Sequence, residues 1–171
     1  MKSILISIRP EWTAKILTGH KTIEVRKTAP KCDLPIDVYV YCTKGGMIVE
    51  KGYSLGFTEP INGKVVAKFT LRKVEKIDVP YPAYFHEVED MYKHITEGSL
   101  LSLGALHAYL GTDSGYAWHI SDLVIFDKPK ELDEFDYLTL SGTRYVSNRS
   151  INGLPSKKHP PQSWCYVEKN E

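Results

Sequence analysis

The chain has 171 residues, of which 42% are hydrophobic and 25% charged, and its formal net charge is +1. This composition indicates a single globular domain with a proper core, and it excludes disorder, coiled coil and collagen-like structure. A net charge this small also excludes recruitment of a polyanion by the field of the whole molecule, so any contact with nucleic acid has to be local.

The first predicted elements are a strand, a short helix and a second strand. Residues Ser3 to Arg9 alternate with the period of two that is typical of a strand. Pro10 suits the first turn of a helix, and the apolar stripe that follows ends at Gly19, so we expect a helix over roughly Pro10 to Thr18. Alternation resumes from Thr22 to Arg26, which should project its polar side chains from one face.

The rest of the chain predicts more strands and two helices. Segments rich in β-branched and aromatic residues predict strands at Asp37 to Cys42, Lys64 to Val74, Tyr116 to Phe126 and Gln162 to Val167. Helices are expected over Tyr84 to Thr96 and Leu100 to Leu110, the second with Ser99 as its N-cap and Gly111 as its stop. Five or six strands with flanking helices favour an α+β fold built on a mixed β-barrel.

Two segments rich in glycine, serine, asparagine and proline are interpreted as loop insertions, near 44–62 and 137–161, within one domain that spans 1–171. The second segment is also basic, because no acidic residue lies between Asp136 and Glu168. Its cations are Arg144, Arg149, Lys157 and Lys158. Two interpretations stay open: this segment contacts a nucleic-acid backbone, or it is a solvated loop that happens to be basic.

The cysteines and the N-terminal segment bear on location. Cys32, Cys42 and Cys165 are odd in number, far apart and without a CxxC pair, so we interpret them as free thiols, two of them in strands. The apolar run Ile4 to Ile8 is too short for a signal peptide, and no segment approaches the roughly 20 apolar residues of a membrane span. We therefore expect a cytoplasmic protein with no membrane segment.

The most informative stretch is Gly19 to Arg26, where a helix stop passes into a strand and places Lys21, Glu24 and Arg26 within a few residues. Three charges so close usually face water. If they instead line a concavity, Lys21 and Arg26 supply donors for phosphate or base oxygens. Glu24 can then accept from an exocyclic amine or orient the arginine.

This stretch carries the pattern G-x-K-x-x-E-x-R directly after a first strand and helix, and it resembles the signature of the ASCH domain, a relative of the PUA fold in RNA-modifying and translation-associated proteins. The strand Tyr116 to Ile120 and the closing segment Pro160 to Val167 are also similar to a bacterial or phage-type branch of that family. The resemblance spans most of the chain. It implies a PUA-like β-barrel and a cleft, lined by the signature residues, that binds RNA or nucleotide-like ligands.

Some ASCH proteins are enzymes, and the resemblance raises this alternative. One small bacterial relative hydrolyses acetylcytidine with a lysine at the place of Lys21 and a threonine nucleophile at the place of Glu24. Thr22 lies two residues along the predicted strand, a displacement of roughly 6.5 to 7 Å, whereas a nucleophile must lie about 3 Å from its target. Glu24 should also oppose any lowering of the pKa of Lys21. We therefore expect binding rather than hydrolysis.

Further candidates come from aromatic residues and histidines. Trp118 and Trp164 fall in predicted strands, where packing is the usual role and base stacking the alternative. His119 beside Trp118 is either a hydrogen-bonded strand residue or a ligand contact. Tyr39 and Tyr41 share a predicted face that could line an opening.

The sequence lacks the motifs of several other functions. Its six histidines form no HxH or HExxH arrangement, so no metal and no cofactor are expected. The chain also lacks a G-x-G-x-x-G, a P-loop and a G-x-S-x-G elbow, which argues against dinucleotide binding, NTP hydrolysis and α/β-hydrolase chemistry.

The leading hypothesis is thus an RNA- or nucleotide-binding domain with a polar, basic cleft and RNA or a nucleotide-like ligand as partner. Its candidate ligand-binding residues are Ser7, Arg9, Lys21, Thr22, Glu24, Arg26, Trp118, His119, Arg144 and Arg149. Two alternatives stay open. One is an amidohydrolase for acylated nucleosides that uses Lys21, and the other is a protein-interaction module. The sequence does not indicate an oligomeric state.

Overall fold

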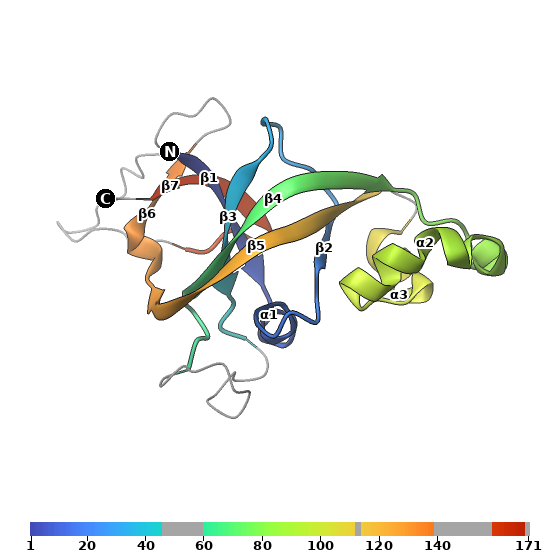
Figure 1. The fold of residues 1–171 in the computed structure, drawn as a ribbon, viewed down its shortest axis with the longest axis horizontal. Coiled ribbons are helices and arrows are strands. Elements are labelled where there is room, and N and C mark those ends of the chain that lie inside the picture. Colours follow the sequence, from blue (N-terminus) through green and yellow to red (C-terminus); the bar gives the residue numbers. More distant parts are fainter. Residues whose placement is uncertain (46–59, 112–113, 139–158, 170–171) are drawn as a thin grey trace.

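The structure is a computed structural model, which describes residues 1–45, 60–111, 114–138 and 159–169 (Figure 1). The predicted loop insertions near 44–62 and 137–161 lie largely outside these residues. Within them, no helix combines the length and the apolar character that a membrane crossing requires.

The described residues form seven strands, three α-helices and two short 3-10 helices. The strands are β1 (Lys2–Ile8), β2 (Ile23–Arg26), β3 (Ile36–Cys42), β4 (Val65–Ile77), β5 (Gly115–Lys130), β6 (Phe135–Leu138) and β7 (Trp164–Lys169). The helices are α1 (Pro10–Leu17), α2 (Phe85–Ser99), α3 (Leu103–Leu110), η2 (Pro82–Tyr84) and η3 (Leu132–Glu134). The predicted α+β class with flanking helices is therefore confirmed.

All seven strands belong to one mixed sheet in the order β2-β5-β4-β3-β1-β7-β6. β1 and β3 pair in parallel, whereas the other neighbours are antiparallel. Because β2 and β6 each pair on one side only, the described sheet is open, and the expected barrel of five or six strands is corrected to seven strands without backbone closure. Register shifts along β4 and β5 explain its curl, since bulges bend and twist a strand.

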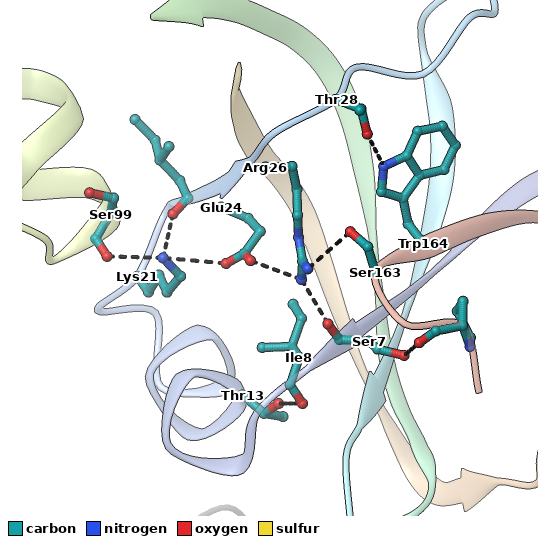
Figure 2. Close-up of polar contacts among 12 residues, drawn as sticks. Ser7, Ile8, Thr13, Lys21, Glu24, Arg26, Thr28, Ser99, Ser163 and Trp164 are labelled. Atoms are coloured by element: carbon teal, nitrogen blue, oxygen red, sulfur yellow. Dashed lines mark hydrogen bonds and ion pairs between the residues drawn. The ribbon is translucent and has the colours of Figure 1, made fainter. Parts of the chain in front are cut away.

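Side chains close part of the gap that the backbone leaves open. β2 lies at one end of the strand order, yet Nη2 of Arg26 donates to the carbonyl oxygen of Ser7 on β1 over 2.7 Å. Just beyond β2, the indole nitrogen of Trp164 on β7 donates to Oγ1 of Thr28 over 3.0 Å (Figure 2). The curled sheet therefore brings β2 back beside β1 and β7.

Three apolar clusters hold the fold together. The largest packs α1 against β1, β3, β4 and β5 and includes the fully buried Trp118. A second joins α2 and α3 to β2, and a third lies on the opposite face of β1. Tyr39 and Tyr41 belong to this third cluster and are almost fully buried, so they pack in a core instead of lining an opening.

The expected elements occur with shifted ends. β4 and β5 extend beyond the predicted ranges, and β6 was not predicted, although only its last two residues fall in the segment near 137–161 interpreted as a loop. The N-cap of α3 is Ser102, whose hydroxyl accepts from the backbone of Ala105, and not the expected Ser99. The thiols of Cys32, Cys42 and Cys165 are free, as predicted, and the last two lie in β3 and β7.

Candidate ligand-binding cavity

A cavity of about 480 Å³ opens between α1, α3, β2 and the end of β1. Its polar lining residues are Ser7, Arg9, Lys21, Glu24, Arg26, Thr43 and Gln162. Its apolar and aromatic lining residues are Ile8, Trp12, Val25, Leu101, Ala105 and Tyr109. The volume lies within the range of roughly 300 to 1,000 Å³ that is typical of small-molecule sites.

Three buried charged residues, Lys21, Glu24 and Arg26, form the floor of the cavity. Lys21 lies at one end of this floor and is only 3% exposed. Its ammonium donates to the carbonyl oxygens of Ile23 and Ser99 over 2.8 and 2.9 Å, and it pairs with Oε2 of Glu24 over 3.3 Å. These three partners engage all three ammonium hydrogens. Burial lowers the pKa of Lys21 despite the opposing effect of Glu24, so the expected opposition from Glu24 is present but weaker than desolvation.

Glu24 lies between two cations. One carboxylate oxygen faces Lys21, and the other lies 3.0 Å from Nη2 of Arg26. The residue is 8% exposed. Because a carboxylate offers about four acceptor positions, Glu24 keeps acceptor capacity toward the cavity after both ion pairs form.

Arg26 connects this floor to β1 and to the segment before β7. Besides Glu24 and Ser7, its guanidinium donates to the hydroxyl of Ser163 over 3.3 Å. Its Nε–H is buried and has no hydrogen-bond partner among the described residues. Figure 2 shows the resulting line of polar contacts, which runs from Ser99 through Lys21, Glu24 and Arg26 to Ser7.

The local sequence explains how these side chains reach the floor. Gly19 has a φ of 76°, a left-handed conformation that suits glycine and ends α1. The backbone N–H of Thr22 then donates to the carbonyl of Gly98 at the C-terminal end of α2, over 2.9 Å. From there, Glu24 and Arg26 alternate along β2 and point the same way.

Two aromatic side chains form walls above this floor. Trp12 comes from α1, and its ring centroid lies 5.1 Å from the ammonium of Lys21. Tyr109 comes from α3 and is 42% exposed. Leu101 and Ala105 continue the wall on the side of α3. The cavity therefore combines an ionic floor with surfaces on which a planar ligand can stack.

The structure brings five predicted site residues together around one cavity, namely Ser7, Arg9, Lys21, Glu24 and Arg26. Arg144 and Arg149 lie outside the described residues.

The other three candidates do not line the cavity. Thr22 is exposed, because it precedes β2 and does not share the inward face of Glu24. Trp118 is fully buried in the main core. The ring of His119 is half-buried, and its Nε2 lies 3.2 Å from a carboxylate oxygen of Glu75.

Sequence reasoning missed much of the wall. Trp12 was recognisable as an aromatic residue on the helix next to the signature. Leu101, Ala105 and Tyr109 carry no local signal, because only the packing of α3 brings them to the cavity. In the part of the chain that the structure describes, no group of three or more His, Cys, Asp or Glu residues is placed to hold a metal ion.

Comparisons with known proteins identify the fold. No protein-family model and no curated protein matches the sequence. The crystal structure of ASCH from Zymomonas mobilis is similar over 98% of this chain and 88% of its own, at 20% identity and a TM-score of 0.61.

Two variants of that bacterial protein give similar values. A tyrosine-to-phenylalanine variant matches over 99% of this chain and 92% of its own, at 19% identity and a TM-score of 0.62. A serine-to-alanine variant matches over 98% and 89%, at 20% identity and a TM-score of 0.60. The class defined by the fold and the cavity is thus an α+β domain with a curled mixed sheet and a polar cleft. The chain has the fold of an ASCH domain, as its signature indicated.

Proposed function

We propose that the chain binds RNA or a nucleotide-like ligand and holds one nucleotide in this cavity. The observation that carries the proposal is the cavity floor, where a buried carboxylate lies between two cations beneath aromatic walls. The ASCH fold supports it, because RNA binding is the function that the resemblance implies. The three free thiols further support the expectation that the protein functions in a reducing compartment such as the cytoplasm.

The floor offers complementary hydrogen-bonding groups to a base. Glu24 keeps acceptor positions for an exocyclic amine or ring N–H, and the guanidinium of Arg26 lies beside it in the cavity lining. Lys21 has no ammonium hydrogen left for a ligand, since two carbonyls and Glu24 engage them. We therefore assign Lys21 the role of positioning Glu24, and Glu24 and Arg26 the role of reading the ligand.

Hydrolysis of an acylated nucleoside remains the second candidate, because burial lowers the pKa of Lys21 as a catalytic base would require. Two observations favour binding over it. The ammonium of Lys21 is fully engaged, and Thr22 lies outside the cavity lining. Incubation with acylated nucleosides distinguishes the two, because hydrolysis predicts release of the acyl group above a buffer control and its loss in Lys21→Met.

Substitution of the exposed wall residue tests the binding proposal without disturbing the buried floor. Tyr109→Ala should weaken binding of nucleoside monophosphates and short single-stranded RNA by about 1 to 3 kcal/mol, the value of one base stacked on an aromatic ring. Isothermal titration calorimetry measures the loss. Tyr84→Ala is the matched control, because Tyr84 is 54% exposed and does not line the cavity. Equal affinities of the two variants would contradict the proposal.

A further inference from the structure

Two sets of cations on the described surface differ in their ion pairing, and the first set is neutralised locally. On β4 and just before it, five cations each form an ion pair with an aspartate or glutamate within 3.1 Å. They are Lys64, Lys68, Arg72, Lys73 and Lys76. These charges contribute little to the field that an approaching anion meets, because each has a counter-charge beside it.

The second set surrounds the mouth of the cavity. Arg9, Lys15 and Lys27 are exposed, and none has an ion-pair partner in the ranges that the structure describes. Arg9 itself lines the cavity. The ammonium of Lys15 lies 4.5 Å from the ring centroid of Trp12, and that of Lys27 lies 5.6 Å from the ring centroid of Tyr109. Each cation is thus part of the cavity wall or beside it.

Glu11 lies one helical turn before Lys15 and does not neutralise it. The ammonium of Lys15 lies over the ring of Trp12 and forms no ion pair with Glu11. The charge of Lys15 also contributes to lowering the pKa of Lys21, so its field reaches the floor. Because Lys21, Glu24 and Arg26 leave the floor with a net positive charge, rim and floor attract an anion together.

We propose that Arg9, Lys15 and Lys27 form a phosphate-binding rim that holds the backbone of a single-stranded polynucleotide on either side of the nucleotide in the cavity. This inference rests on the proposed function and adds the ligand's chemical class, a strand with flanking phosphodiesters. A single strand fits because a base enters a cavity only after it leaves its stack, which is least costly where it is unpaired. The whole-molecule charge of +1 cannot supply this attraction.

The salt dependence of binding tests the rim directly. Three phosphate contacts on a single strand predict a slope of log K against log salt of about −2, since each contact contributes about −0.7. A fluorescein-labelled random octaribonucleotide and its DNA counterpart are titrated by fluorescence anisotropy between roughly 50 and 200 mM salt. The RNA and DNA arms distinguish the two sources of the same phosphodiester chemistry.

The double variant Lys15→Gln/Lys27→Gln should flatten this slope by about 1.4, about 0.7 for each cation removed. Lys76→Gln/Lys93→Gln is the charge-matched control, because both lysines are largely exposed, both are ion-paired and neither lines the cavity. It should keep the wild-type slope. An unchanged slope in the rim variant, or equal losses in both double variants, would overturn the rim.

Failure of the rim and failure of the proposed function give different results. If a nucleoside monophosphate and the octaribonucleotide bind with equal affinity, and both lose affinity in Tyr109→Ala, the cavity function stands and the rim is wrong. If neither ligand depends on Tyr109, the proposed function itself is wrong. If the strand binds more tightly than the monophosphate and only the rim variant removes the difference, both proposals are supported.

Discussion

At the scale of single residues, Glu24 holds the cavity floor together. Its carboxylate forms ion pairs with both Lys21 and Arg26, and all three residues are buried. Buried charges are stable only when paired, because desolvation of an isolated ion costs several kcal/mol. Loss of the negative charge would leave two cations in a buried site with no carboxylate between them.

Glu24→Gln should therefore lower the free energy of unfolding by about 3 to 5 kcal/mol, the usual cost of removing one partner of a buried ion pair. Urea denaturation measures the change. Asp122→Asn is the control, because it breaks the exposed pair with Arg72 and should cost no more than about 1 kcal/mol. Similar small losses of unfolding free energy in both variants would mean that the ion pairs of Glu24 with Lys21 and Arg26 do not stabilise the fold.

At the scale of elements, the cavity depends on how α2 ends against β2. The last carbonyls of α2 accept from the backbone of Thr22 and from the ammonium of Lys21, which satisfies groups that a helix end leaves unpaired. Gly98 permits this contact. A Cβ at that position would lie 2.7 Å from Cδ1 of Ile23, closer than packed atoms approach.

Gly98→Ala should destabilise the protein by about 1 to 3 kcal/mol, the cost of overpacking, and should weaken ligand binding because α2 moves away from Lys21. Gly104→Ala in α3 is the control. A Cβ there meets nothing closer than 3.8 Å, so alanine should be neutral or stabilise by up to about 1 kcal/mol through its helix propensity. Thermal and urea denaturation measure both variants. Equal stability of Gly98→Ala and Gly104→Ala would show that the close approach of α2 to β2 does not require a glycine at position 98.

A second contact between elements predicts a dependence on pH. Glu75 on β4 accepts from Lys73 and lies within 3.2 Å of Nε2 of both His94 on α2 and His119 on β5. The hydrogen bond from Lys73, followed by those of the histidines, lowers the pKa of Glu75 to about 2. A carboxyl with a lowered pKa stabilises the fold above its ordinary value of 4.5, and this stabilisation disappears as the pH falls toward 2.

Glu75→Gln should thus cost about 1 kcal/mol near neutral pH, a modest value because the pairs are partly exposed to solvent. The difference in unfolding free energy between wild type and variant should shrink between pH 4.5 and about 2. Urea denaturation as a function of pH measures it. A difference that stays constant over this interval would show that Glu75 does not act through its charge.

The sequence predicted most elements, because periodicity and caps act locally. The alternation of β1 and the Pro10 to Gly19 boundaries of α1 correspond closely to the observed elements. β6 was missed because it has only four residues and overlaps the start of a segment rich in turn-forming residues. The N-cap of α3 is Ser102 and not the predicted Ser99, because α2 continues to Ser99. The backbone carbonyl of Ser99 accepts from the ammonium of Lys21.

At the scale of the whole molecule, the cavity arises because the curled sheet joins segments far apart in the chain. The floor was predictable, since Lys21, Glu24 and Arg26 lie within one short stretch. The wall was not, because Leu101 and Tyr109 reach it only through the packing of α2 and α3 on β2. The open sheet was also unforeseen, since backbone closure depends on strand pairing that no local pattern encodes.

In the proposed binding mode, a nucleotide enters the cavity and contacts both its floor and its wall. NMR titration of the ¹⁵N-labelled protein with ribonucleoside 5′-monophosphates measures these contacts, because Arg26 and Trp12 both line the cavity and each side chain carries an N–H that gives its own signal. Both signals should shift together, while the indole of Trp118 in the core shifts little. If neither signal moved, or if shifts clustered around His94 and His119 instead, the nucleotide would not bind in this cavity.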